Sequence, residues 1–132
     1  SGNDSRVCFS APLAKLLEGA DRGTVYVRVD YTDKSGRVYH NNYCLDKQKN
    51  MNYPKVDLQT EVRSIEGGYE VTVSTDKFAR AVCLSVADNE SVYSDNYFDV
   101  QPKSSVQVQV RTRLSAEAFN ASLRLTCLNN EF

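Results

Sequence analysis

The residues of this chain that could carry acid–base or nucleophilic chemistry are few. His40 is the single histidine, and it lies in Val38–Asn42, where apolar and polar side chains alternate as in a β-strand. No serine or cysteine in a recognisable nucleophile motif accompanies it, and the chain has no GxSxG elbow, HExxH helix or phosphate-binding loop. We therefore interpret His40 as a structural or surface histidine, and we expect no catalytic residue in this chain.

Carboxylates gather between residues 88 and 99, where they could bind a cation or form a pair of catalytic acids. Asp88 and Glu90 precede Asp95 and Asp99, but this spacing does not match an EF-hand loop. Asp95-Asn96 is typical of a turn in which side-chain oxygens accept hydrogen bonds from nearby backbone N–H groups. We predict a structural turn, with no metal and no cofactor. A calcium site and paired acids are the alternatives.

The cysteines show no CxxC spacing, and with one histidine in the chain a zinc site of Cys and His ligands is not expected. We predict four small, half-buried thiols. Two disulfides are the alternative if the parent protein is exported, and their connectivity does not follow from the sequence. The four residues are Cys8, Cys44, Cys83 and Cys127.

Tyrosines are the candidates for ligand binding, because an exposed aromatic ring can stack on the apolar face of a sugar. The chain has eight tyrosines but no tryptophan, and this lack of tryptophan argues against a lectin-like site. Tyrosine is also common at the margins of sheets, where its ring packs and its hydroxyl stays in water. That second interpretation is the one we favour, and it predicts that Tyr69, on the face of Val71 and Val73, lies in the core. The candidates for carbohydrate binding are Tyr39, Tyr43, Tyr93 and Tyr97.

Length, composition and charge are ordinary for a soluble globular protein. The 132 residues are 41% hydrophobic and 25% charged, enough for one domain or for one small domain with an appendage. With 16 basic and 17 acidic residues there is no basic excess for nucleic acid. No apolar run approaches the roughly 18 residues of a membrane span. Ser1–Ser5 shows no signal pattern, so we expect either a cytoplasmic protein or a piece of a longer one.

Alternation of β-branched and polar residues is the dominant pattern. It predicts antiparallel strands with one buried face and one face in water. The row Val82, Leu84 and Val86 has a less polar second face, which predicts a central strand covered on both sides. Turn signals at residues 33–36, 66–68, 88–91 and 101–104 separate the runs, as in a β-sandwich. The other alternating runs are Val25–Tyr31, Val56–Val62, Tyr69–Ser74, Val106–Arg111 and Leu123–Cys127.

Two short helical segments and a linker interrupt the strands. Pro12–Gly19 has Pro at its start and Gly at its end, and Ser115 is a predicted N-cap with Phe119 pointing inward. Asp46–Lys55 is polar and aperiodic, and we predict a linker there. The linker would separate about three N-terminal strands, too few to close a sandwich, from about seven C-terminal strands.

Two segments of the C-terminal part carry a resemblance to a known family. Tyr69–Ser85, followed by Tyr93–Pro102, resembles the C-terminal immunoglobulin-like domain of glycoside hydrolase family 2 β-mannosidases. In that family a vT.vTSD.FAR.V.LS run precedes an SDNyFDL.PGE turn and an alternating valine strand. Ser94–Asp99 matches the second motif closely, whereas Lys103 stands where glycine is usual and Ser104 where glutamate is usual.

The N-terminal part is similar to the last strands of the preceding sandwich domain in those enzymes. The segments that carry this likeness are Ala11–Gly19, Val25–Val29 and Gly36–Val38. The resemblance implies an all-β protein with an immunoglobulin-like antiparallel β-sandwich over residues 51–132. Residues 1–50 would be the tail strands of a truncated neighbouring sandwich domain plus a linker.

The resemblance also implies an indirect function. The chain would be a non-catalytic accessory domain of a family 2 enzyme resembling β-mannosidase or β-galactosidase. The parent would hydrolyse terminal β-mannosides or related β-glycosides with retention, on two glutamates of a (β/α)₈ barrel that this chain lacks. No residue of the chain matches a catalytic position. Its partners would be the barrel and other domains of the same parent chain, and the parent would be periplasmic or secreted, or else cytoplasmic.

Two alternatives from other classes stay open. In the first, the domain is a carbohydrate-binding module that stacks oligosaccharide on its surface tyrosines. In the second, it is a self-associating sandwich, a homo-oligomer in which the exposed N-terminal strands add to the sheet edge of a neighbour. Neither involves nucleic acid or a membrane.

Overall fold

The structure is a computed structural model that describes residues 4–131 of the chain. Ser1 to Asn3, part of the N-terminus that lacks a signal pattern, and Phe132 lie outside this range. The chain forms two compact units, Ser1–Asn52 and Tyr53–Phe132. The boundary between them falls within the segment that the sequence predicts to be a linker.

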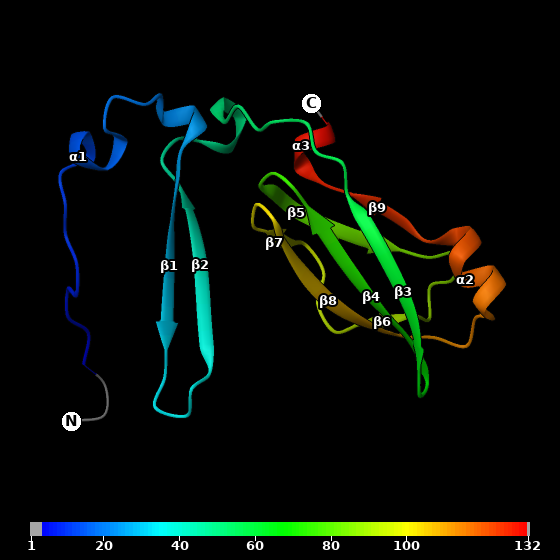
Figure 1. The fold of residues 1–132 in the computed structure, drawn as a ribbon. Helices are drawn as coiled ribbons and strands as arrows, with labels where there is room; N and C mark the ends of the chain where they lie inside the picture. The colour runs from blue at the N-terminus through cyan, green and yellow to red at the C-terminus, as the bar shows by residue number, and fades with distance from the viewer. Residues whose placement is uncertain (1–3, 132) are drawn as a thin grey trace. The chain divides into compact units, whose positions relative to one another are not determined.

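The first unit is built around a β-hairpin (Figure 1). Its two strands pair antiparallel along their whole length, and Asp33 and Gly36 lie in the turn as predicted. The prediction of about three strands is wrong, because the described residues before the hairpin form only a helix, a 3₁₀ turn and irregular segments. The elements are α1 (Leu13–Leu17), η1 (Arg22–Thr24), β1 (Tyr26–Thr32), β2 (Val38–Cys44) and η2 (Gln48–Asn50).

The second unit is the predicted immunoglobulin-like β-sandwich, and every strand pair in it is antiparallel. One sheet has the order β3-β4-β8-β6 and the other the order β7-β5-β9, so β5 is central as expected (Figure 1). The elements are β3 (Gln59–Ile65), β4 (Gly68–Thr75), β5 (Ala79–Ser85), β6 (Val92–Tyr93), β7 (Phe98–Val100), β8 (Ser104–Arg111), α2 (Ala116–Ser122), β9 (Arg124–Thr126) and α3 (Leu128–Glu131).

The core lies between the two sheets and follows from the alternation in the sequence. Along β4 every second residue is buried, and the other residues face outward. Each valine or leucine removed from water in this way contributes about 1.5–3 kcal/mol. Tyr69 is buried, as predicted, and stacks on Phe119 with ring centroids 4.2 Å apart. The other buried apolar residues of the cluster are Val71, Val73, Ala79, Val82, Leu84, Phe98, Val100, Val108, Val110 and Cys127.

The short helices close the sandwich at its ends. The Ser115 hydroxyl accepts a hydrogen bond from the Ala118 N–H at 3.3 Å, which confirms the predicted N-cap of α2. This cap fixes the start of the helix that carries Phe119, whose side chain is fully buried. In the first unit, α1 ends at Leu17 because Glu18 already adopts a left-handed backbone conformation, one residue before the predicted glycine.

The first strand of the sandwich begins three residues later than the sequence predicts. Val56 has the right residue type for a strand, but its backbone is already engaged. Its N–H donates to Oδ1 of Asn130 at 3.2 Å, and its carbonyl accepts from Nδ2 of the same side chain at 2.9 Å. Because one amide side chain occupies both backbone groups, pairing with β4 starts only at Gln59.

The turn before β8 contains a backbone conformation that the residue there disfavours. Lys103 has φ of 56°, in the left-handed region where a Cβ atom costs about 1–2 kcal/mol. Its N–H still donates to the Thr75 carbonyl at 2.9 Å, so the turn keeps its hydrogen bond. This conformation explains why glycine suits the position in the family that the motif resembles.

We predict that Lys103→Gly raises the free energy of unfolding by about 0.5–1 kcal/mol, since the relief of strain exceeds the entropy cost of glycine. Urea unfolding followed by circular dichroism measures the change. Lys103→Ala is the matched control, because it removes the charge and keeps the Cβ atom. Equal stability of the Gly and Ala variants would contradict the assignment of strain to this residue.

Candidate functional site

The Ser94–Asp99 motif is where sequence reasoning located both a family signature and candidate acids. The side-chain amide of Asn96 pairs with the backbone of β5 as a neighbouring strand would. Its Oδ1 accepts from the Leu84 N–H at 2.8 Å, and its Nδ2 donates to the Leu84 carbonyl at 2.9 Å. Both backbone groups of one β5 residue are therefore satisfied by the loop that precedes β7.

Asp99 stabilises an irregular part of β5. The pairing register between β5 and β7 shifts between Ala79 and Val82, and Ala81 has a positive φ of 51°, so a β-bulge lies here. Oδ1 of Asp99 accepts from the Ala81 N–H at 2.9 Å, and Oδ2 pairs with Nη1 of Arg80. The Asp99 and Arg80 side chains are only 13% and 24% exposed. The carboxylate thus holds the bulge and neutralises a half-buried guanidinium.

Two more carboxylates of this stretch, those of Asp95 and Asp88, also accept hydrogen bonds within the domain. Asp95 accepts from the Asn96 N–H at 2.8 Å. Asp88 accepts from the Ser91 N–H at 2.8 Å and from the Thr112 hydroxyl at 3.2 Å. These contacts confirm the predicted Asx turn. Among residues 4–131 no group of three or more His, Cys, Asp and Glu side chains is arranged to hold a metal ion.

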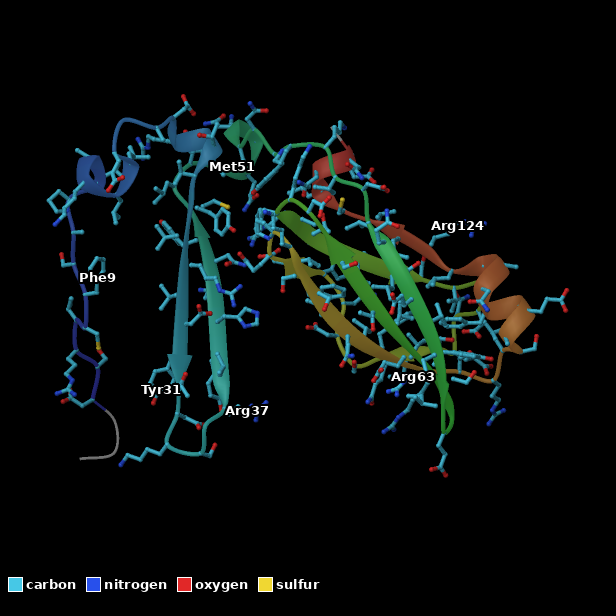
Figure 2. All side chains as sticks on the ribbon, viewed as in Figure 1. Phe9, Tyr31, Arg37, Met51, Arg63 and Arg124 are labelled. Carbon is cyan, nitrogen blue, oxygen red and sulfur yellow. The ribbon has the colours of Figure 1, made fainter. Side chains whose placement is uncertain are left out.

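Two of the candidate tyrosines lie on one face of the β1–β2 hairpin. Tyr43 is 67% exposed, and Tyr39 is 46% exposed opposite Tyr31 in the pairing register. The rings of Tyr31 and Tyr39 are 6.2 Å apart and tilted by 33°, and the Arg37 guanidinium lies 5.2 Å from the centre of the Tyr39 ring. Figure 2 labels Tyr31 and Arg37 near the end of the hairpin. Aromatic rings and one cation thus gather at this end, with exposed Val29 on the same face.

The hairpin turn is organised by a carboxylate that also reaches one of these tyrosines. Oδ1 of Asp33 accepts from the Ser35 hydroxyl at 2.6 Å and from the Ser35 and Arg37 N–H groups at 2.8 and 3.0 Å. Oδ2 accepts from the Tyr39 hydroxyl at 3.3 Å. The hydroxyl of Ser35 is the main cause that lowers the pKa of Asp33, and the backbone and Tyr39 bonds act in the same direction.

The other two candidate tyrosines belong to the sandwich and differ in environment. Tyr93 packs against the core, its hydroxyl accepts from the Val86 N–H at 3.1 Å, and burial raises its pKa. Tyr97 is 73% exposed and has a left-handed φ of 61°. A hydrogen bond with the Cys83 side chain raises the pKa of Tyr97. A sugar-binding role for each of the four tyrosines stays a prediction. Tyr39 and Tyr97 each combine an exposed ring with a polar partner, Asp33 and Cys83 respectively.

Asn129, near the C-terminus, is a residue that sequence reasoning missed. Its side chain is 3% exposed and makes three hydrogen bonds of 2.8 Å, to the Arg80 N–H, the Pro54 carbonyl and the Phe78 carbonyl. It therefore holds the chain segment that leads into the sandwich against the start of β5. No motif or periodicity around Leu128–Glu131 signals this role.

The histidine and the cysteines have no clustered arrangement. His40 is exposed on β2, opposite Asp30, which confirms a surface histidine. All four cysteines are free thiols. Cys44 and Cys83 are half-buried as predicted, but Cys127 is fully buried in the core and Cys8 is exposed. The expectation of four half-buried thiols is wrong for these last two, because Cys127 follows β9 into the core and Cys8 lies in an irregular segment.

The surface of the sandwich has shallow hollows without aromatic rings. One of them lies where β3, β4 and β8 meet, and each of its lining residues carries a polar or charged group. A sugar entering it would find hydroxyl and carboxylate partners but no ring on which to stack. The lining residues are Asp57, Gln59, Ser74, Thr75, Asp76, Lys103, Ser104 and Ser105.

The fold and the motif contacts together define an immunoglobulin-fold domain whose signature residues serve its own backbone. A family model of an Ig-fold domain, Ig_mannosidase, matches residues 52–131. The chain therefore belongs to the Ig_mannosidase family, the immunoglobulin-like domain of mannosidase-type glycoside hydrolases, which confirms the resemblance stated above for the C-terminal part. No curated protein matches the chain. No helix among the described residues is long and apolar enough to cross a membrane.

Proposed function

We propose that this chain is a non-catalytic accessory domain of a larger glycoside hydrolase of family 2 that resembles β-mannosidase. The observation that carries the proposal is the family match across the whole sandwich, residues 52–131. The parent enzyme would hydrolyse terminal β-mannosides or related β-glycosides with retention, using two glutamates on a barrel outside this chain. The role of the sandwich is then to support the barrel or to shape the approach to its cleft.

The hydrogen bonds of the acids in and near the family motif favour a structural role for this domain over a catalytic one. A catalytic acid needs a carboxyl group free to approach substrate. Asp99 instead accepts bonds from Arg80 and from the Ala81 N–H, and Asp88 accepts bonds from backbone N–H groups and a threonine hydroxyl. The most conspicuous acids of the chain are therefore committed to local structure.

The first unit supports the same proposal from its own surface. A two-stranded hairpin is at best marginally stable alone in water, and Val29, Tyr31 and Tyr43 are 59%, 63% and 67% exposed on one face of this one. Such a face needs a covering layer. We infer that other domains of the same parent chain supply it, as expected for strands that belong to a neighbouring sandwich domain.

The experiment uses the parent enzyme with Asp99→Ala, which weakens the sandwich without touching the barrel. We expect a lower melting temperature and a shorter half-life at elevated temperature, with kcat/KM per folded molecule unchanged on nitrophenyl β-mannoside. Asp95→Ala, in the same motif but exposed, is the matched control and leaves both quantities unchanged. A large fall in kcat/KM at unaltered stability would contradict a supporting role.

A second candidate function is carbohydrate binding, and Tyr97 is the observation that favours it. A bulky residue with a left-handed φ is a strained arrangement, which proteins keep mainly where it serves a purpose. Among the described residues of the sandwich its ring is also the most exposed aromatic ring, and its hydroxyl interacts with Cys83. Titration of the chain with manno-oligosaccharides, followed by ¹H–¹⁵N NMR, tests this candidate. Shifts that disappear in Tyr97→Ala support it, and a flat titration of the folded chain removes it.

A further inference from the structure

The four-stranded sheet of the sandwich has one long strand at its edge. Within the part of the chain that the structure describes, β4 is the only strand that pairs with β3. The register runs without a shift from Gln59 opposite Ser74 to Ile65 opposite Gly68. Figure 2 labels Arg63 on this strand. In an antiparallel sheet such an edge presents a row of backbone N–H and C=O groups that can pair with another strand.

The other edges of the two sheets are much less suited to pairing. β6 has two residues, and β7 and β9 have three residues each. Short edges and irregular edges are the usual protection against strand addition, and proline is another. β3 has seven residues, no proline and no bulge. Its edge is therefore the one in this sandwich that is fit for a partner strand.

The side chains of β3 divide cleanly between the two faces of the sheet. Val62 lies opposite Val71, on the core face. Glu61 and Arg63 lie on the outer face, opposite Thr72 and Glu70. Arg63 pairs with Glu70 at 2.8 Å, yet its side chain remains 73% exposed. It therefore has room for a second carboxylate on its free side.

The charges on this strand are complementary to a second copy of the same strand. When two β3 strands pair antiparallel about a two-fold axis at Val62, residues whose numbers add to 124 lie opposite each other. Glu61 of each copy then faces Arg63 of the other, so two opposite-charge pairs form on the outer face. Moving the axis by one residue places Glu61 opposite Glu61, or Arg63 opposite Arg63, on the face where side chains meet. Both shifted registers still match the core face with the core face and the outer face with the outer face, because opposed residue numbers keep the same parity. The charges therefore select the register.

We propose that the chain forms a two-fold homodimer through antiparallel pairing of β3 with β3 of a second copy, centred on Val62. The two four-stranded sheets then become one continuous sheet of eight strands. Each Arg63 lies between Glu70 of its own chain and Glu61 of the other copy. A two-fold contact of this kind uses the same patch on both subunits and closes the assembly at two.

The expected dimer is weak, because one pair of strands buries less surface than the roughly 1,600 Å² of a standard stable interface. Its dissociation constant therefore lies in a range that concentration can sample. Sedimentation velocity of the full chain, from dilute solution to about 1 mM, should show a reversible shift from monomer to dimer. A single monomer species over that whole range overturns the proposal.

Charge reversal tests the register. In a dimer of Glu61→Arg, each new arginine faces Arg63 of the other copy, which makes two arginine pairs. In a dimer of Arg63→Glu, each new glutamate faces Glu61 of the other copy, which makes two glutamate pairs. We expect each variant alone to weaken dimerisation by at least about tenfold. An equimolar mixture of the two variants should dimerise again, because each interchain pair then joins an arginine and a glutamate. Failure of the mixture to recover dimer, with both variants folded, contradicts this pairing.

Two further variants keep the test decisive. If Arg63→Glu loosens the fold because Glu70 loses its partner, Arg63→Glu with Glu70→Lys restores the pair within the chain and takes its place in the mixture. Glu117→Arg, at an exposed position of α2, is the control for the change in net charge and should leave dimerisation unchanged. Tyr43→Ser, on the hairpin, should also leave it unchanged. Loss of dimer in Tyr43→Ser, but not in Glu61→Arg, would assign association to the hairpin and overturn the proposal.

Discussion

Asp99→Ala lowers the free energy of unfolding of the sandwich by about 3 kcal/mol. The substitution removes the acceptor of the Ala81 N–H and leaves the Arg80 guanidinium, which is 24% exposed, without its counter-charge. Removing one member of a largely buried ion pair costs about 3–5 kcal/mol, and the partial exposure of Arg80 places this case at the lower end. Urea unfolding of the 132-residue chain, followed by circular dichroism, measures the change.

Two matched variants separate the charge from the hydrogen bonds. Asp99→Asn keeps an acceptor for the Ala81 N–H and loses the charge, so we expect a smaller loss, about 1.5 kcal/mol. Asp95→Ala removes an exposed carboxylate of the same motif and costs about 0.5 kcal/mol or less. If Asp99→Ala were as mild as Asp95→Ala, the motif would not have the structural role that its contacts indicate.

Phe119→Ala is expected to lower the free energy of unfolding of the sandwich by about 4 kcal/mol. Phe119 is fully buried and is among the largest such side chains, and its ring stacks on Tyr69 at 4.2 Å. Truncation removes the ring from the core and leaves a cavity, for which phenylalanine typically costs about 3–5 kcal/mol. The stacking partner Tyr69 is itself tied to the Leu114 carbonyl at 3.0 Å, which limits how far it can collapse into the space.

The control for this prediction is another phenylalanine that lies at the surface. Phe9 is 75% exposed, and Phe9→Ala should change the free energy of unfolding by about 0.5 kcal/mol or less. Differential scanning calorimetry of both variants distinguishes them directly. Similar melting temperatures for Phe119→Ala and Phe9→Ala would mean that α2 does not close the core.

Much of the sandwich could be predicted because its strands obey one simple rule. The alternating valines of β4 and β8 predict which face of each strand is buried, and Ser115 predicts the start of α2. These signals are local: each depends on residues two or three positions apart. The family motif at Ser94–Asp99 added the class of immunoglobulin-like domain, which alternation alone does not specify.

The features that could not be predicted depend on contacts between residues far apart in the sequence. Asn130 binds the backbone of Val56 and thereby delays β3, although 74 positions separate them. Asn129 bridges Pro54 and Phe78 in the same manner. No sequence pattern around these asparagines predicts a hydrogen bond from the side chain to a distant backbone group, because the partner is defined only by the folded structure.

The candidate site could be predicted only as a set of residue types. The tyrosines differ in exposure. Tyr97 and Tyr43 are largely exposed to water, whereas the ring of Tyr93 packs against the core and its hydroxyl oxygen accepts a hydrogen bond from the Val86 N–H. The sequence alternation around Tyr93 does not reveal this difference, since the strand has only two residues. The left-handed backbone conformation of Tyr97 could not be predicted either, because in a sequence it is glycine, and not tyrosine, that marks such a position.

The family to which the chain belongs and the hydrogen bonds of Asp88 and Asp99 both favour a domain with a structural role and no catalytic residue of its own. The most direct test is turnover of nitrophenyl β-mannoside by the purified 132-residue chain, compared with a buffer blank and with the Asp99→Ala variant. We expect no hydrolysis above the blank for either protein. Hydrolysis that survives repeated purification and is lost in Asp99→Ala, with the variant still folded, would contradict it.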